Sequence, residues 1–398
     1  MREVPNFQTR PLWMEVSASR LRANWNAVRK AAGVSIDVIA IVKADAYGHG
    51  SRECAPVFAQ AGARWLGVTS VEEGIAVRQA LGVLPRDHEP RILIMCGVWQ
   101  REARFCITHQ LTPVVWEPYQ LAMLEEEARR QRLLPRDLAV HLEIDTGMSR
   151  QGAMPGAALD KLLAHFTPKS MLRLEGVMTH LASAEDTAGM QNAAQIEVFR
   201  DAVKQCAKAR PEIIHIGNTS SVDGNVVQPW LPQLAKSIGA KAMTRAGLAL
   251  YGYELPLTAG SSLVLTQPAM EWKTRIVSMR SVATGTSIGY SATFTAPEPM
   301  RLALLPVGYA DGFRRELSSR GSVLIRNRRA PIVGRVSMDL TVVDVTHIPS
   351  AEVGDEVLLI GTRGSEHIDA NDHATIAETI PYEILCGISD RVPRILVD

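Results

Sequence analysis

Polar residues close several of the apolar, strand-like runs in this 398-residue chain. Lys43 follows the run IDVIAIV and opens the segment KADAYGHG, His180 follows LRLEGVMT, and Arg245 closes KAMTR. Another run, IIHIG, contains His215 and leads into the polar triplet at 218–220. In α/β barrels the side chains at the carboxyl ends of the strands meet on one face and form the active site. These residues are therefore candidates for catalysis or binding.

The residue types at these strand ends suggest one kind of chemistry. A lysine at the end of a buried strand can hold a carbonyl cofactor as a Schiff base. Thr219, Ser220 and Gly247 are of the type that binds phosphate through hydroxyls and backbone N–H groups. Together with Arg245 on the same rim, they point to pyridoxal phosphate attached to Lys43.

Each of these residues also has an ordinary interpretation. Lys43 could reach solvent from its strand end, and His180 and His215 could be hydrogen-bonded imidazoles of the core. Arg245 could pair with a carboxylate, and Thr219 could cap a helix. Their common position at the strand ends of one rim favours the cofactor site.

Strand-like and helix-like segments alternate through the first two thirds of the chain. The apolar runs lie at 36–42, 65–69, 91–95, 111–115, 138–144, 172–179, 213–217 and 241–245. Amphipathic stretches precede or separate them at 17–33, 71–81, 118–131, 155–166 and 195–209. Eight repeats over roughly 230 residues predict an α/β fold, a (β/α)8 TIM-like barrel at 13–258, more than an open doubly wound sheet.

The pattern changes after about residue 260. Helical periodicity gives way to short strands separated by Gly- and Pro-bearing turns. We expect a C-terminal all-β domain at 263–398, with the junction at 257–262. Residues 1–12 precede the first barrel helix and are candidates to join this second domain.

The composition indicates a globular protein that acts on small molecules. The chain is 46% hydrophobic, and 43 basic against 42 acidic residues give a formal charge of +1. This balance offers no general field for nucleic acid or a membrane surface. No signal-like or membrane-spanning apolar stretch is found, so we expect a cytoplasmic protein. The five cysteines form no C-x-x-C pair and predict reduced, mostly buried thiols and no metal site; they are Cys54, Cys96, Cys106, Cys206 and Cys386.

Nine motifs in a fixed order resemble the alanine racemases, whose fold is a barrel that binds pyridoxal phosphate followed by a β-domain. They are VKADAYGHG (42–50), DTGMSR (145–150), GVMTH (176–180), HIGNTS (215–220), TRAGLALYG (244–252), GYSATF (289–294), PVGYADGFRR (306–315), PIVGRVSMD (331–339) and YEILCGISDRVPR (382–394). The resemblance covers essentially the whole chain.

The resemblance implies a two-base mechanism that interconverts L-alanine and D-alanine. Lys43 would carry the cofactor and act as one acid/base, and Tyr290 would act as the other on the opposite face. Arg245 would face the pyridine nitrogen, and because a guanidinium donates a hydrogen bond without giving up its proton, that nitrogen should stay unprotonated. The other residues implied around the cofactor are Tyr47, His180, Asn218, Thr219, Ser220, Gly247, Leu248 and Tyr382.

The resemblance also assigns residues around the substrate. Arg150 would contact the substrate carboxylate, and His180 would orient Tyr290 through a hydrogen-bond chain to Arg245. Met338 and Asp339 would line the substrate end. Tyr309 would lie on the access path. Ordinary packing is the alternative for the two tyrosines and for Met338.

One position departs from the family pattern. Two residues before DTGM many members carry a lysine, often carbamylated, whose negative charge holds the arginine of the motif, whereas this chain has Glu143. A carboxylate supplies the same charge without modification. The alternative is that Glu143 pairs with a surface cation.

The resemblance further implies a homodimer in which each active site is shared between two chains, and a role in supplying D-alanine for peptidoglycan. A serine or broad-specificity racemase is the nearest alternative. A fold-type-III decarboxylase would need an acid such as Cys386 from the β-domain, but the residues around Cys386 match the racemase ending. A non-catalytic pyridoxal-phosphate protein would not need the β-domain or Tyr290.

Overall fold

The computed structural model describes residues 9–82, 89–260 and 262–398. Residues 1–8 of the expected N-terminal segment and Ser261 of the expected junction lie outside this description. The chain forms two compact units, one of residues 1–20, 47–53 and 268–398, the other of residues 21–46 and 54–267. Each unit is described separately below.

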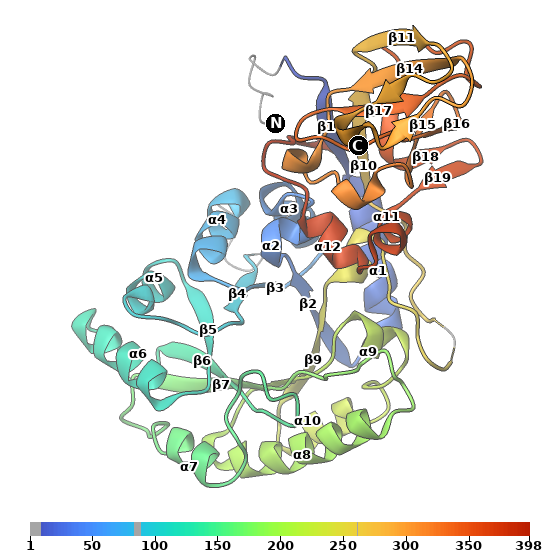
Figure 1. Ribbon diagram of the computed structural model, residues 1–398. Helices are drawn as coiled ribbons and strands as arrows, with labels where there is room; N and C mark the ends of the chain where they lie inside the picture. Colours follow the sequence, from blue (N-terminus) through green and yellow to red (C-terminus); the bar gives the residue numbers. More distant parts are fainter. Residues whose placement is uncertain (1–8, 83–88, 261) are drawn as a thin grey trace. The chain divides into compact units, whose positions relative to one another are not determined.

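The larger unit contains a closed barrel of eight parallel strands in sequence order, which Figure 1 shows as a ring with helices outside it. The described strands are β2 (Ile36–Ile41), β3 (Trp65–Val68), β4 (Arg91–Ile94), β5 (Leu111–Val115), β6 (Leu138–Glu143), β7 (Leu172–Met178), β8 (Ile213–His215) and β9 (Lys241–Ala246). The predicted barrel is confirmed, and each strand ends within two residues of its predicted end.

Helices lie before the first barrel strand and in the segments after the strands, outside the ring of strands. They are α1 (Ala18–Ala32), α3 (Ser51–Gln60), α4 (Val71–Leu81), α5 (Glu102–Thr108), α6 (Pro118–Arg130), α7 (Ala157–Leu163), α8 (Met190–Cys206), α9 (Thr219–Asp223) and α10 (Leu231–Ser237). In α4 the buried residues Val71, Gly74 and Val77 follow the helical spacing. No helix within the described ranges has the length and apolar character needed to cross a bilayer.

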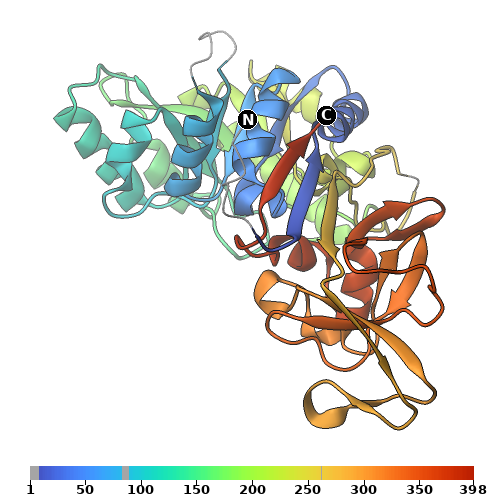
Figure 2. The ribbon, with the colours of Figure 1, turned by 90° about the horizontal axis from the view of Figure 1, so that it is seen from above.

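The smaller unit is built mainly from antiparallel strands. Its largest sheet has the order β16-β15-β18-β10-β1-β20, with β19 paired to β18. Strand β1 lies between β10 and β20, as Figure 2 shows. The strands of this sheet are β1 (Leu12–Ser17), β10 (Met270–Arg275), β15 (Ser322–Ile325), β16 (Arg328–Pro331), β18 (Glu356–Arg363), β19 (Glu366–Ile368) and β20 (Arg394–Val397).

The remaining strands of this unit form two smaller sheets, β11 (Ser278–Val282), β14 (Met300–Leu305) and β17 (Thr341–Asp344), and β12 (Ser287–Ile288) with β13 (Phe294–Thr295). The predicted all-β character is confirmed. The unit also contains two short helices, α11 (Ala370–Ala377) and α12 (Pro381–Cys386).

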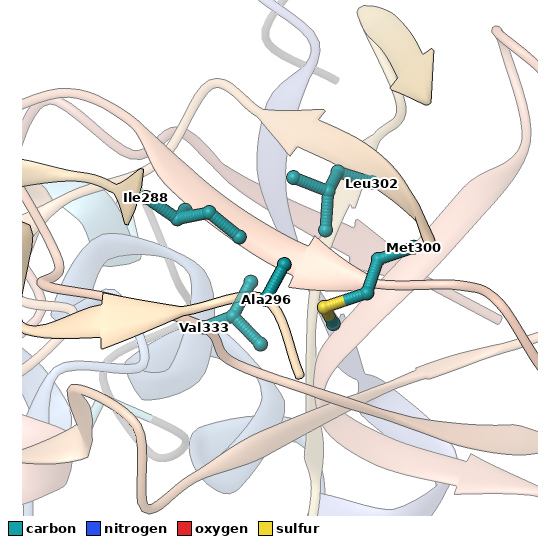
Figure 3. Packing of buried hydrophobic residues seen from close by; sticks show 5 residues of the cluster. All are labelled: Ile288, Ala296, Met300, Leu302 and Val333. Carbon is teal, nitrogen blue, oxygen red and sulfur yellow. The ribbon is translucent and has the colours of Figure 1, made fainter. Parts of the chain in front are cut away.

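A small apolar cluster fixes the turn that carries Tyr290. Figure 3 shows its members, which are Ile288, Ala296, Met300, Leu302 and Val333. Ile288 ends β12, and its pairing with Phe294 closes the turn over 289–293. Gly289 has a φ of +76°, a backbone conformation that residues with a side chain rarely adopt. The GYSATF motif therefore needs glycine at this position. The cluster therefore holds the backbone of Tyr290 while its side chain stays 70% exposed.

Replacement of Trp25 tests the packing of α1 on the barrel unit. The Trp25 ring is buried against Phe58, and its indole N–H donates to the Ala61 carbonyl at 3.0 Å. Trp25→Ala should lower the free energy of unfolding by about 3–5 kcal/mol, measured by urea denaturation, because it opens a large cavity. Trp25→Phe, which keeps a ring and loses the hydrogen bond, should cost clearly less. Equal losses for the two variants would show that Trp25 does not act through packing.

Candidate active site

Lys43 lies at the carboxyl end of β2 and begins a left-handed backbone turn. The next four residues have φ between 50° and 55°, so α2 (Lys43–Tyr47) is a left-handed turn made without glycine. This conformation costs about 1–2 kcal/mol for each such residue. Strain of this kind persists only where surrounding contacts impose it, and it concentrates at functional sites.

Glu73, in the first turn of α4, supplies one of these contacts. Its Oε1 accepts from the Ala44 N–H at 2.7 Å, and its Oε2 accepts from the backbone N–H and the hydroxyl of Thr69, both at 2.8 Å. The carboxylate thereby ties the residue after Lys43 to the end of β3. The sequence gives no sign of this role of Glu73, because an acidic residue in a first helical turn is also an ordinary partner of the helix dipole.

Arg245 is buried in β9 and donates to acceptors on neighbouring strands. Its Nη2 lies 2.7 Å from the Thr179 carbonyl oxygen and 3.0 Å from His180 Nδ1, and its Nη1 lies 3.2 Å from His215 Nδ1. Burial lowers the pKa of Arg245 to about 10, which leaves it charged at neutral pH. No carboxylate bonds to it within the described residues, so the carboxylate-pair interpretation is wrong.

These contacts determine which nitrogen of His180 carries a proton. Because a guanidinium only donates, His180 Nδ1 must accept, and its proton must be on Nε2. Burial and then the charges of Arg245, Arg150 and Lys43 lower the pKa of His180 to about 3. His180 is therefore a neutral group that offers an N–H from Nε2. Lys43, Arg150 and Arg245 are thus all close enough to His180 to act on it electrostatically.

The loops after β8 and β9 lie side by side. Asn218 caps α9 by accepting from the Ser221 N–H at 3.1 Å. Thr219 does not cap α9; its hydroxyl accepts from the N–H groups of Gly247 and Ala249 at 3.2 and 3.4 Å. This contact joins the start of α9 to the start of the 3₁₀ helix Leu248–Tyr251. The ends of the seventh and eighth strands are where barrels commonly bind phosphate.

Glu143 is buried at the end of β6 and bonds to a neutral side chain. Its Oε2 accepts from Gln151 Nε2 at 2.5 Å, and Gln151 also donates to the Met95 carbonyl. Burial raises the pKa of Glu143, although the Gln151 hydrogen bond and the charges of Arg245 and Arg150 oppose the shift. The surface-pair alternative is wrong, since Glu143 is 2% exposed. Arg150 is exposed and has no hydrogen bond or ion pair within the described residues, so Glu143 acts on it only at a distance.

The other predicted site residues belong to the smaller unit. Tyr47 is buried, its ring centroid lies 5.8 Å from that of Tyr382, and burial raises its pKa. Tyr290, Tyr309 and Met338 are 70%, 43% and 53% exposed, so core filling does not explain Met338. Asp339 is also exposed and pairs with Arg391 at 2.7 Å.

A closed parallel barrel with polar and charged side chains at the carboxyl ends of its strands has the form of a barrel enzyme. Two family models match the chain, the N-terminal domain of alanine racemase at residues 16–255 and the C-terminal domain at 269–396. The alanine racemases of Halothermothrix orenii and Symbiobacterium thermophilum are 37% and 39% identical to it, each over 97% of both chains. An alanine racemase structure from Bartonella henselae, with covalently bound pyridoxal phosphate, has a TM-score of 0.81 at 25% identity, covering 97% of this chain and 99% of that one.

The chain therefore belongs to the alanine racemase family. This result confirms the enzyme class that the nine motifs predicted, an isomerase acting on amino acids.

The buried histidines predict how stability depends on pH. Burial is the main cause that lowers the pKa of His141, His180 and His215 in the native state. Below a pH of about 6.5 the unfolded chain binds protons that these native imidazoles cannot. The free energy of unfolding should therefore fall as the pH falls from 7.5 to 5.5, mostly below pH 6.5, by up to about 1.4 kcal/mol in total for each such histidine.

Urea denaturation of two variants at both pH values checks this prediction. His180→Asn should show a flatter dependence than the unsubstituted protein, whereas replacement of the exposed His347 by Asn should leave the slope unchanged. Identical slopes for the His180 variant and the unsubstituted protein would contradict the account.

Proposed function

We propose that this protein interconverts L-alanine and D-alanine, using pyridoxal phosphate attached to Lys43 and a second acid/base, Tyr290, on the opposite face. The observation that carries the proposal is the setting of Lys43. Its amine has no hydrogen-bond or ion-pair partner within the described residues, and it shares the barrel rim with Arg245 and His180.

The residues of the rim fit the cofactor. Three cations, Lys43, Arg150 and Arg245, lower the pKa of His180, and this positive charge suits an anionic phosphate and a substrate carboxylate. The hydroxyls of Thr219 and Ser220 lie at the ends of the strands where barrels bind phosphate. We infer that Asn218, Gly247, Leu248, Tyr47 and Tyr382 complete this binding region. When bound, the cofactor supplies an electron sink for the bond to the α-carbon.

Arg245 and His180 would set the electronics of the site. Arg245 is held by acceptors and stays charged, so it would donate to the ring nitrogen of the cofactor without protonating it. His180 offers the N–H of Nε2, which would donate to the Tyr290 oxygen and orient that phenol. A lysine and a tyrosine could then remove and return the α-proton on opposite faces.

The substrate end would be formed by side chains that the single chain leaves exposed. Arg150 would bind the substrate carboxylate, and Met338, Asp339 and Tyr309 would line the approach to it. We place this activity in the cytoplasm, in the supply of D-alanine for peptidoglycan. Assays with L-serine and other L-amino acids would reveal a broader specificity.

Loss of the Lys43 amine tests the cofactor attachment. The purified protein should be yellow, and borohydride should bleach its absorbance and leave the cofactor covalently bound, because Lys43 is the attachment point. Lys43→Ala should keep the circular dichroism spectrum and lose both the reducible band and the formation of D-alanine. A reducible band in Lys43→Ala would place the attachment at another lysine.

Replacement of the Tyr290 hydroxyl tests the two-base scheme. Tyr290→Phe should abolish racemisation, followed by D-alanine formation, while Lys43 still exchanges the α-proton of one enantiomer with deuterated water. Tyr119→Phe, which removes an exposed hydroxyl on α6, is the matched control and should keep both activities. Equal exchange from L- and D-alanine in Tyr290→Phe would contradict the scheme.

We also infer that the active site is shared between two chains of a homodimer. The exposure of Tyr290, Tyr309 and Met338 supports this proposal, since exposed site residues are free to complete the barrel of a second copy. In a closed two-fold pair, each site would combine Lys43 of one chain with Tyr290 of the other.

Mixing two inactive variants tests the shared site. In a dimer of one Lys43→Ala chain and one Tyr290→Ala chain, one site carries both defects and the other carries neither. Co-expression with two different tags, followed by purification of the mixed dimer, should restore about half the activity per dimer, as two-fold symmetry requires. An inactive mixed dimer would show that Tyr290 acts in its own chain or is not the second base.

A further inference from the structure

A continuous series of hydrogen-bonded polar side chains, buried except at its Arg91 end, crosses the inside of the barrel. It begins where Arg91 opens β4 and donates to both oxygens of Glu175 at 2.9 and 2.7 Å. Glu175 Oε2 lies 3.3 Å from His141 Nε2, and His141 Nδ1 lies 2.8 Å from His215 Nε2. His215 Nδ1 then meets Arg245 Nη1 at 3.2 Å, near the opposite end of the barrel.

Arg245 and Glu175, at the two ends of this hydrogen-bonded series, determine which nitrogen of each histidine carries a proton. Arg245 only donates, so His215 Nδ1 must accept and His215 must carry its proton on Nε2. That N–H donates to His141 Nδ1, so His141 also carries its proton on Nε2 and donates it to Glu175. A carboxylate only accepts, and the sequence of donors and acceptors is therefore consistent from end to end.

The barrel is shaped around His141. A side-chain carbon on Gly176, the residue paired with His141 in β7, would lie 2.3 Å from His141 Nδ1. On another strand the Trp65 ring lies 5.3 Å from the imidazole, and the Arg91 guanidinium lies 4.6 Å from the Trp65 ring. The imidazole and the guanidinium are thus both held in place by packing.

A contribution to folding stability alone does not explain why polar side chains occupy the inside of the barrel. Barrel interiors are usually filled by layers of branched apolar side chains. Charges inside a protein lose their hydration, and replacing a buried ion pair by well-packed apolar residues is often neutral or stabilising. Glu175 and both imidazoles are at most 4% exposed, which means that the barrel gives up apolar packing to keep them.

The geometry points to Glu175 as a positioning residue that acts on Arg245 through His141 and His215. By accepting at one end, it requires both imidazoles to turn a lone pair toward the carboxyl end of the barrel. Arg245 then meets an acceptor at Nη1 and keeps the orientation in which it can donate to the cofactor ring. The kinetic part of this inference depends on the proposed function, whereas the proton positions do not.

Glu175→Gln would disturb the proton order. One end of the new amide would be an NH₂ group, and Arg91 donates at both former oxygen positions, so one donor would face another. If that NH₂ takes the Oε2 position, His141 has to move its proton to Nδ1, where it meets the Nε2 proton of His215. Each such proton movement places the pair of facing donors one residue closer to Arg245.

Nitrogen NMR of the protein without cofactor tests the proton order directly. With ¹⁵N-labelled histidine, and signals assigned by single His→Gln variants, both His141 and His215 should show protonated Nε2 and unprotonated Nδ1 at pH 7. A proton on Nδ1 of either residue, alone or in a doubly protonated ring, would overturn the inference. This arm needs no cofactor and no substrate, so it can succeed even if the proposed function fails.

Kinetics of the loaded enzyme test the effect on Arg245. Glu175→Gln should lower kcat roughly tenfold or more and leave KM within about twofold, a change typical of partners that orient a functional group. Glu175→Asp, which still only accepts, should keep the NMR pattern and most of kcat. The matched control is Glu125→Gln, which removes a buried carboxylate bonded to Arg129 and Ser170 in the same unit and should keep kcat.

Two outcomes of the kinetic arm decide against the inference. An unchanged kcat in Glu175→Gln would make Glu175 a purely structural residue, and so would an equal loss in Glu125→Gln. If Glu175→Gln does not fold, His141→Leu interrupts the same series of hydrogen bonds one residue closer to Arg245. It should likewise lower kcat and leave KM within about twofold.

Discussion

The buried guanidinium of Arg245 is the constraint on which the site depends. Inside the barrel it cannot be hydrated, and its pKa stays high enough to keep it charged, so every neighbour must offer a lone pair. The Thr179 carbonyl, His180 and His215 do so. That requirement fixes the protons of both imidazoles, and it leaves His180 with an N–H at Nε2.

The barrel supplies these acceptors because neighbouring parallel strands end at one rim. β7, β8 and β9 pair in order, which brings the end of β7 and His215 beside Arg245. Lys43 comes from β2, the other neighbour of β9, on a left-handed turn tied down by Glu73. A strained lysine turn and a buried cation are both costly, and both are held by contacts that the rest of the barrel makes rigid.

Much of this arrangement could be predicted from the sequence. Most of the eight runs are clearly apolar, whereas KAMTR at 241–245 has a low apolar content. Lys43, His180 and Arg245 follow directly from where the runs end. The left-handed turn could not be predicted, since KADAY contains no glycine to mark it. Glu73, His141 and Glu175 were missed because a polar residue within a helix or strand pattern gives no sign of whether it faces solvent or the barrel interior. Gln151 became visible only as the partner of Glu143.

The protonation state of the cofactor ring nitrogen tests the central claim most directly. A ¹⁵N spectrum of the protein loaded with pyridoxal phosphate labelled at that nitrogen would report it at neutral pH. If Arg245 is held as a pure donor, the nitrogen should appear unprotonated and hydrogen-bonded, and should remain so from pH 6 to 8. A signal from a protonated ring nitrogen would contradict the account, because a donor fixed by Thr179, His180 and His215 cannot face a second donor.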